Sequence, residues 1–312
     1  MNAEEQVVTS IALKHYGQAA GMERLSRFQN SVYRLHFPWG TRILKLAESP
    51  HQPAIRRELS LLQALEGSPV PVPPVDAADV EGKLCGRPYL VMQSVGQRTV
   101  FDAVQADPDD NGGGNDTWHE QMGQTLARIH QLDLHEHPQV VEELCTSRYT
   151  VAAYWQSVRG LAVRFGEEGV LPQDSVQCFL QHDLPSVEGH RLCHSDFSER
   201  QCIVNEHRIA AVVDWESSWL GNPHIDLAIA QTQLELSRSP EIVDQFVAAY
   251  HLTLACVADK ITDRRLNVVR MGVIVILLDR FGAQGRAAWQ YVERSGRLLR
   301  AQQLFTFYAQ RL

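Results

Sequence analysis

The spacing of apolar and polar residues divides the chain into a strand-rich first part and a helix-rich remainder. A helix is predicted over residues 4–17, followed by strands at 22–27 and 32–37. A Trp39-Gly40 turn leads into a third strand at 41–47. The pattern therefore predicts a small antiparallel sheet in the first hundred residues.

A helix and a proline-rich connector follow this sheet. Residues 54–65 repeat with the 3.6-residue period of a helix that Gly67 ends, and the PVPVPP segment at 69–74 is predicted to be extended. A hairpin then ends in the apolar strand 88–92. Residues 93–97 are predicted to form a hinge between two lobes.

The remaining residues are predicted to be mainly helical. Residues 106–116 are too polar and glycine-rich to pack, which indicates a surface loop. From Trp118 onward the apolar residues follow a helical period, interrupted by a short hairpin at 202–213. Further helices are predicted at 223–236, 241–252, 263–281 and 286–308.

Composition narrows the classes of protein. The chain has 312 residues, 44% of them hydrophobic, which is enough for a sizeable core. Its six cysteines contain no C-x-x-C pair, so they predict a reducing compartment rather than a zinc site or a disulfide framework. An acidic N-terminus and a longest apolar run of only 273–278 argue against export and against a membrane span. The expectation is a cytoplasmic protein.

Net charge bears on possible partners. A net charge of −8 argues against sequence-independent binding to nucleic acid, which depends on Lys and Arg neutralising phosphates. It is compatible with a cationic small-molecule substrate, although general solubility explains the same charge more simply. The sequence leaves open whether the protein is a monomer or a homodimer.

Lys45 is conspicuous because the chain has only four lysines and this one lies in an apolar strand. Strand alternation places Lys45 on the same face as Ile43, where a buried ammonium needs an anionic partner. In the helix 54–65, Glu58 falls within the apolar arc and is therefore directed inward. A strand lysine paired with a helix glutamate is how protein kinases hold a lysine against ATP phosphates.

Two aspartates carry the stronger chemical signal. Asp196 lies in Cys193-His194-Ser195-Asp196-Phe197, and Asp214 ends the apolar run Ala211-Val212-Val213. Phosphoryl transfer to an alcohol needs one carboxylate to orient the hydroxyl and another to hold magnesium against the phosphates. We expect Asp196 and Asp214 to divide these tasks and to converge on one cleft.

These segments resemble the aminoglycoside phosphotransferases and their choline-kinase-like and homoserine-kinase-like relatives. Residues 194–216 resemble that family's H-G-D-x-x-x-x-N motif and the following strand that ends in I-D-W, and residues 221–228 resemble its G-D-P-x-x-D-L-A segment. Residues 29–35 and 126–130 resemble further family segments. The resemblance implies an α+β, protein-kinase-like two-lobe fold, with a small antiparallel-sheet N-lobe (1–93) carrying one main helix and a larger, mostly helical C-lobe (94–312).

The resemblance also implies roles for particular residues. ATP and Mg²⁺ are the implied cofactors, and Asp196 is the implied catalytic base. The implied acceptor is a hydroxyl of a small molecule, either aminoglycoside-like or another small amino-alcohol or metabolite. The implied nucleotide contacts are Lys45, Glu58, Asn30, Ser31, Met92, Gln93 and Val95; the implied metal ligands are Asp214 and Gln201; and the implied structural supports are His194 and Asp226.

Two positions depart from the family pattern. Ser195 stands where the family usually has glycine, and Gln201 where it usually has a metal-binding asparagine. Gln201 offers the same amide oxygen on a longer side chain, with Glu199 as a further carboxylate nearby. The sequence thus leaves open a catalytically weak or silent nucleotide-binding module as the alternative.

Other polar residues support weaker hypotheses. Glu216, Asp279 and Glu293 are candidate contacts for a cationic substrate, or simply solvated helix residues. The neighbouring His130, His135 and His137 are interpreted as incidental rather than as a metal site.

Overall fold

The computed structural model describes residues 2–27, 30–49, 53–107, 117–184, 186, 189–254, 263–283 and 285–312. The predicted loop at 106–116 therefore lies almost wholly outside the described residues. The chain divides into two compact units that are not continuous in sequence. The first comprises residues 1–115, 134–143 and 199–217, and the second comprises residues 116–133, 144–198 and 218–312.

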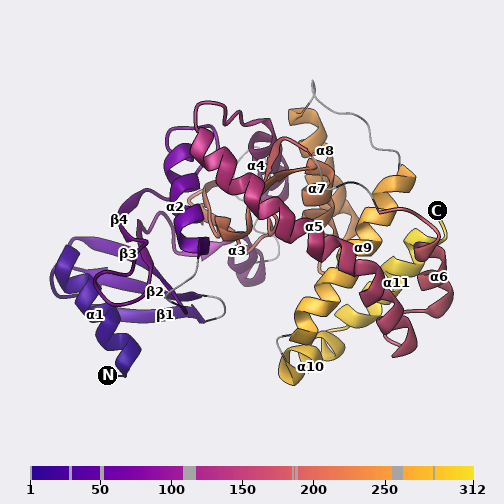
Figure 1. The fold of residues 1–312 in the computed structure, drawn as a ribbon, viewed down its shortest axis with the longest axis horizontal. Coiled ribbons are helices and arrows are strands. Elements are labelled where there is room, and N and C mark those ends of the chain that lie inside the picture. Colours follow the sequence, from indigo (N-terminus) through magenta and orange to yellow (C-terminus); the bar gives the residue numbers. More distant parts are fainter. Residues whose placement is uncertain are drawn as a thin grey trace. The chain divides into compact units, whose positions relative to one another are not determined.

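The first unit is built on a five-stranded antiparallel sheet with the order β1-β2-β3-β5-β4 (Figure 1). A separate three-stranded sheet has the order β6-β8-β9. The elements of this unit are α1 (Ala3–His15), β1 (Gly21–Arg27), β2 (Asn30–Phe37), β3 (Gly40–Ala47), α2 (Pro53–Leu65), β4 (Val75–Asp79), β5 (Tyr89–Gln93), β6 (Arg98–Thr99), α3 (Val100–Ala106), β8 (Cys202–Asn205), β9 (Arg208–Val212) and the 3-10 turn η1 (Trp215–Ser217).

The five-stranded sheet has one face packed against α1. Val8 and Ile11 of α1 are fully buried against strand residues that include Leu44 and Leu46 of β3. Because side chains alternate along a strand, Lys45 between them points to the opposite face. The alternation of side chains along β3 therefore places Lys45 on the face of the sheet away from α1.

The second unit is mostly helical, with one two-stranded sheet formed by β7 and β10. Its elements are α4 (Trp118–Gln131), α6 (Gln173–Leu180), β7 (Arg191–Cys193), β10 (Trp219–Gly221), α7 (Pro223–Glu235), α8 (Pro240–Thr253), α9 (Asp263–Ala283), α10 (Arg286–Arg294) and α11 (Arg297–Ala309), together with most of α5 (Pro138–Glu167), which begins in the first unit.

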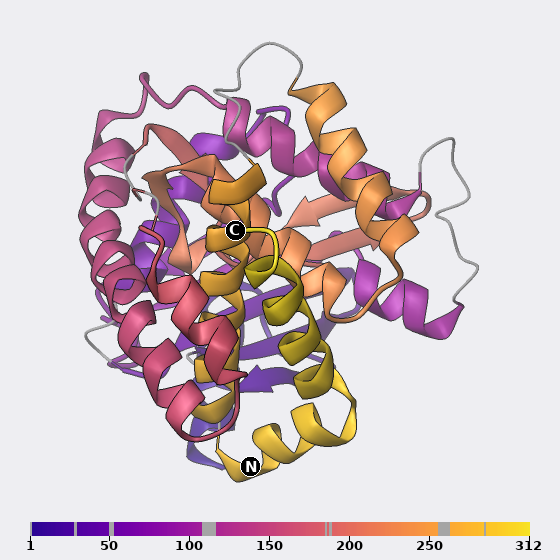
Figure 2. The ribbon, with the colours of Figure 1, turned by 90° about the vertical axis from the view of Figure 1, so that its right-hand side faces the viewer.

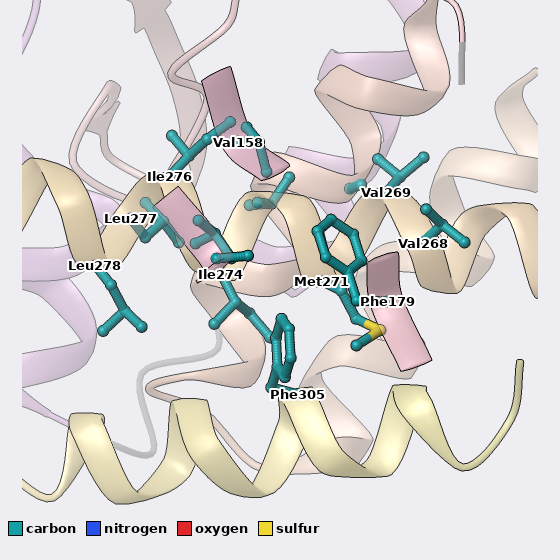
Figure 3. Close-up of a cluster of buried hydrophobic side chains, with 14 of the residues drawn as sticks. Val158, Phe179, Val268, Val269, Met271, Ile274, Ile276, Leu277, Leu278 and Phe305 are labelled. Carbon is teal, nitrogen blue, oxygen red and sulfur yellow. The ribbon is translucent and has the colours of Figure 1, made fainter. Parts of the chain in front are cut away.

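The core of the second unit is centred on the middle of α9, where residues 271–278 are apolar and all buried. Met271, Ile274 and Leu278 are buried among side chains from α5, α6 and α11 (Figure 3). α9 and α11 run side by side in this unit (Figure 2). None of the helices in the described part of the chain is both long and apolar enough to cross a bilayer.

The predicted helix over 286–308 is wrong, because the structure has two helices there. α10 ends at Arg294 and α11 begins at Arg297. Gly296 between them has a φ of 74°. This left-handed conformation favours glycine and interrupts the helical path, so Gly296 is the residue that separates the two helices.

Candidate active site

A cavity of about 440 Å³ lies in the first unit, between the five-stranded sheet and the β8–β9 hairpin. Its volume falls within the range of about 300–1,000 Å³ that is usual for small-molecule sites. Apolar side chains such as Val32, Ile43 and Ile203 line part of it. The wall also includes residues that the sequence predicted for the site, namely Lys45, Glu58, Met92, Gln93, Val95, Gln201 and Asp214.

The Lys45 ammonium lies among three carboxylates. Its Nζ is 2.7 Å from Glu58 Oε2, 2.6 Å from Asp214 Oδ1 and 2.8 Å from Glu216 Oε2. The Lys45 side chain is only 5% exposed, whereas that of Asp214 is 41% exposed. Three acidic groups therefore share one buried cation, and Asp214 is the member that reaches solvent.

The surroundings of Lys45 shift two pKa values. Burial by itself lowers the pKa of Lys45, but the charges of Glu58, Asp214 and Glu216 outweigh burial and raise that pKa above its ordinary value. Burial raises the pKa of Glu58, with Lys45 opposing the shift. Lys45 therefore stays charged and holds the carboxylates together.

Local structure explains how these groups meet. Glu58 lies on α2, where its Oε1 accepts a hydrogen bond from the backbone N–H of Trp215 at 3.3 Å. The Trp215 indole N–H donates to the Val212 carbonyl at 2.9 Å, which closes the turn after β9. Asp214 has a φ of 71° within that turn. The chain thus turns sharply and presents Asp214 and Glu216 to the same ammonium.

Asn30 and Ser31 lie at the start of β2, and both are buried. The Asn30 side-chain amide donates a hydrogen bond to Glu216, and Ser31 Oγ donates to Glu48 Oε1 at 2.7 Å. Asn30 Oδ1 is buried without a hydrogen-bond partner among the described residues. Asn30 therefore joins the first residue of β2 to the Lys45 cluster through Glu216.

The predicted hinge is tied to its neighbours by backbone bonds. The Gln93 N–H donates to the Pro74 carbonyl at 2.9 Å, and the Ser94 N–H donates to the Thr41 carbonyl at 3.3 Å. A Cβ on Gly96 would overlap the carbonyl oxygen of Val204 in β8. This close approach of two backbones requires glycine and fixes that wall of the cavity.

The second unit contains the loop that carries Asp196. The fully buried Asp226 carboxylate, in the first turn of α7, accepts hydrogen bonds from the backbone N–H groups of His194 and Ser195, both at 2.7 Å. The Asp196 N–H in turn lies 3.3 Å from His194 Nδ1. Asp226 thereby holds the backbone immediately before Asp196.

Ser195 has a φ of 75°, in the left-handed region. A residue with a Cβ is strained there, by roughly 1 kcal/mol, whereas glycine adopts this conformation freely. The geometry gives a physical reason why glycine is usual at this position of the motif, and the two bonds to Asp226 hold the serine in place.

His130 completes the support of this loop. Its Nε2 is 3.1 Å from Asp226 Oδ2 and its Nδ1 is 2.8 Å from the Tyr250 hydroxyl. Burial raises the pKa of Asp226, but hydrogen bonds and the nearby His130 and His194 outweigh burial and lower that pKa below its ordinary value. Cys193 also lies close to His130 and Asp226. The hydrogen bond between His130 and Asp226 explains why these two side chains lie together.

Asp196 itself has an arginine partner. Arg280 Nη1 of α9 donates to Asp196 Oδ1 at 3.4 Å, and the two side chains are 40% and 37% exposed. Asp196 belongs to the second unit and Asp214 to the first. The expected convergence of the two aspartates therefore stays a prediction.

Sequence reasoning missed two of these contacts. Glu216 was a candidate for substrate binding, yet it contacts Lys45 and Asn30; its position two residues after Asp214 was the available signal. The sequence gave no signal for Arg280, because it lies 84 residues from Asp196.

The other acidic residues considered for substrate binding have protein partners. Asp279 accepts a hydrogen bond from Arg164 at 2.8 Å, and Glu293 accepts one from Trp289 at 3.1 Å.

The donor atoms of the cavity suit magnesium and phosphate. Asp214 and Gln201 offer carboxylate and amide oxygens, which are the ligands that Mg²⁺ prefers. Lys45 offers an ammonium for phosphate oxygens, and the apolar residues around Met92 offer a surface for an aromatic base. The residues present therefore fit a metal-bound nucleotide.

This fold, with a sheet lysine paired to a helix glutamate, defines a kinase-like phosphotransferase class. The sequence model of the phosphotransferase enzyme family (APH) matches residues 22–259. The chain belongs to this family.

Solved structures show the same fold at low sequence identity. A candidate aminoglycoside phosphotransferase from Ralstonia eutropha JMP134 is 17% identical with a TM-score of 0.67, covering 98% of both chains. A thermostable variant of aminoglycoside phosphotransferase APH(4)-Ia, in complex with AMP-PNP and hygromycin B, is 14% identical with a TM-score of 0.62, covering 96% of this chain and 97% of that one. These likenesses confirm the predicted two-lobe α+β fold class.

A curated relative is much longer than this chain. Mouse (Mus musculus) acyl-CoA dehydrogenase family member 10 is 26% identical over 197 residues, which is 57% of this chain and 17% of the relative. The chain thus matches only about a sixth of that protein.

Proposed function

We propose that the protein transfers the γ-phosphate of ATP to a hydroxyl group of a small molecule, with magnesium. The observation that carries the proposal is the cavity of the first unit, where Lys45, Glu58, Asp214 and Gln201 are gathered. The nucleotides bound by the structural relatives, AMP-PNP in APH(4)-Ia and ATP in the streptomycin complex of APH(2'')-IIa, support it.

Each residue has a proposed task. Lys45, kept in place by Glu58, binds phosphate oxygens, while Asp214 and Gln201 hold magnesium, which neutralises charge on the phosphates. Asp196 orients the acceptor hydroxyl and accepts its proton. The acceptor oxygen then forms the new bond to phosphorus as the bond to the ADP oxygen breaks. Asp226 keeps the backbone before Asp196 in position.

The Asp196→Ala variant tests this assignment. The substitution removes the proposed proton acceptor and leaves the first-unit cavity intact. We therefore expect phosphate transfer to fall by a factor of about 10²–10⁴, with the affinity for nucleotide unchanged. The measurements are ADP formation with a phosphorylated acceptor and calorimetric titration with AMP-PNP and magnesium. Undiminished transfer by the variant would refute the role of Asp196.

A catalytically silent nucleotide-binding module is the second candidate, and Gln201 motivates it. The Gln201→Asn variant distinguishes the two, because asparagine restores the usual metal ligand of the family motif. A working kinase with an unusual metal site should turn over faster after this change. Binding of ATP without magnesium, with no ATP hydrolysis by either form, would favour the silent module.

A further inference from the structure

We infer that the acceptor of this phosphotransferase carries an anionic group, a carboxylate or a phosphate, and that Arg280 binds it. This inference rests on the proposed function, since it assumes that Asp196 receives the acceptor hydroxyl. The observation behind this inference is the hydrogen bond that the Arg280 guanidinium donates to the Asp196 carboxylate, at 3.4 Å.

The exposure of both side chains indicates a contact that a ligand can reach. Arg280 is 40% exposed and Asp196 is 37% exposed. Half-exposed ion pairs contribute only about 0–1 kcal/mol to stability, so folding does not explain this pair well. An acceptor whose hydroxyl reaches Asp196 therefore also comes within reach of a solvent-accessible guanidinium.

Arg280 has Asp196 as its acidic partner, and its acidic neighbour on α9 does not compete for it. Asp279, next to it on α9, is engaged by Arg164 of α5 at 2.8 Å. Within α9 the acidic residue beside Arg280 thus has a cation of its own from another helix. An arginine fork matches the two oxygens of a carboxylate or phosphate, so its planar geometry suits an acidic acceptor.

The charge of the C-terminal region agrees with this inference. Residues 263–312 contain nine arginines and only three acidic residues, although the whole chain has a net charge of −8. Two of these acids, Asp279 and Glu293, contact protein side chains. A polycationic acceptor such as an aminoglycoside needs acidic groups to bind, and the arginine beside Asp196 repels it.

The test is an acceptor panel assayed by ADP release with ATP and magnesium. The anionic probes are 3-hydroxybutyrate and glycerol 3-phosphate, the uncharged probes are 3-hydroxybutyramide and glycerol, and the cationic probe is kanamycin. We expect transfer to a carboxylate or phosphate probe, at least about tenfold weaker kcat/KM for its uncharged counterpart, and none to kanamycin. The two anionic probes distinguish the two acidic groups.

Arg280 variants connect the preference to this residue. Arg280→Gln should raise the KM for the anionic acceptor by about 10- to 100-fold, with the affinity for AMP-PNP unchanged, and Arg280→Lys should retain part of the effect. A purely structural role would not distinguish charged from uncharged acceptors. Arg286→Gln, on the adjacent α10, serves as the matched control and should leave the KM unaltered.

Three outcomes overturn the inference: transfer to kanamycin or to the uncharged probes in preference to the anionic ones, no transfer to either anionic probe, or an Arg280→Gln variant with an unchanged KM for the acid. Transfer to an uncharged or cationic probe would leave the proposed function standing. Loss of nucleotide binding by the unmodified protein would instead contradict the proposed function itself.

Discussion

At the scale of single residues, Lys45 and Asp226 each organise one part of the proposed site: Lys45 the carboxylates of the cavity, and Asp226 the backbone before Asp196. Lys45 lies between three carboxylates in the first unit, and Asp226 binds two backbone N–H groups in the second. Alternation along β3 and the inward position of Glu58 on α2 were visible in the sequence. For the third carboxylate, Glu216, the sequence offered only its position two residues after Asp214, because the turn after β9 that directs it toward Lys45 has no pattern of its own.

The depressed pKa of Asp226 predicts how stability depends on pH. A carboxyl whose pKa is lower in the folded than in the unfolded protein stabilises the fold above its unfolded value, near 3.9, and this contribution is lost as pH falls through the folded value. In the Asp226→Asn variant, this carboxyl no longer titrates. We therefore expect its free energy of unfolding, lower at pH 7, to fall less steeply than wild type below about pH 4.

Urea denaturation followed between pH 3 and 7 measures this difference. The Asp226→Asn variant keeps the size of the side chain, although an amide cannot accept as many hydrogen bonds from the His194 and Ser195 backbone. Parallel stability curves for the two proteins across the acidic range would contradict the assigned role of Asp226 as a charged support.

At the scale of elements, the bounds predicted for the helices at 54–65, 241–252 and 263–281 lie within two residues of the observed ones, whereas short elements were predicted poorly. β7 and β10 have three residues each, too few for a period to be recognised, and they pair only through tertiary contact. The break between α10 and α11 was missed because Gly296 lies inside an otherwise continuous helical pattern. Glycine is tolerated in helices, so its conformation could not be read from spacing.

The β5–β6 connection offers an element-scale prediction. Gly96 lies so close to the backbone of β8 that a methyl group there would displace one of the two segments. Since both segments line the cavity, Gly96→Ala should weaken nucleotide binding by about tenfold or more and lower stability by about 1–3 kcal/mol.

Gly160→Ala in α5 is the matched control. A Cβ at Gly160 meets open space, and alanine in a helix interior is favoured over glycine by roughly 0.5–1 kcal/mol. The same substitution should thus stabilise the protein at one position and destabilise it at the other. Calorimetric nucleotide titration and thermal denaturation of both variants provide the measurement, and equal effects would contradict the steric argument at Gly96.

At the scale of the whole molecule, the family resemblance predicted the α+β two-lobe class, and the family match and structural relatives confirm that class. The predicted lobe boundary at residue 93 remains a prediction, since the compact units are interleaved along the sequence. Composition gave the net charge of −8 but not its distribution. Among the arginines of the last fifty residues, Arg280 gains a proposed role because the structure places it beside Asp196.

The surplus of carboxylates around Lys45 implies that the pocket repels an unaccompanied polyanion. A bare triphosphate would approach three acidic side chains that share one ammonium, on a protein that is itself acidic. In the proposed function, Asp214 and Gln201 would hold a divalent ion whose charge offsets this repulsion. We expect a chelator such as EDTA to weaken the affinity of the protein for ATP by at least about tenfold in a titration. The concentration of divalent metal would then determine how much of the protein has ATP bound.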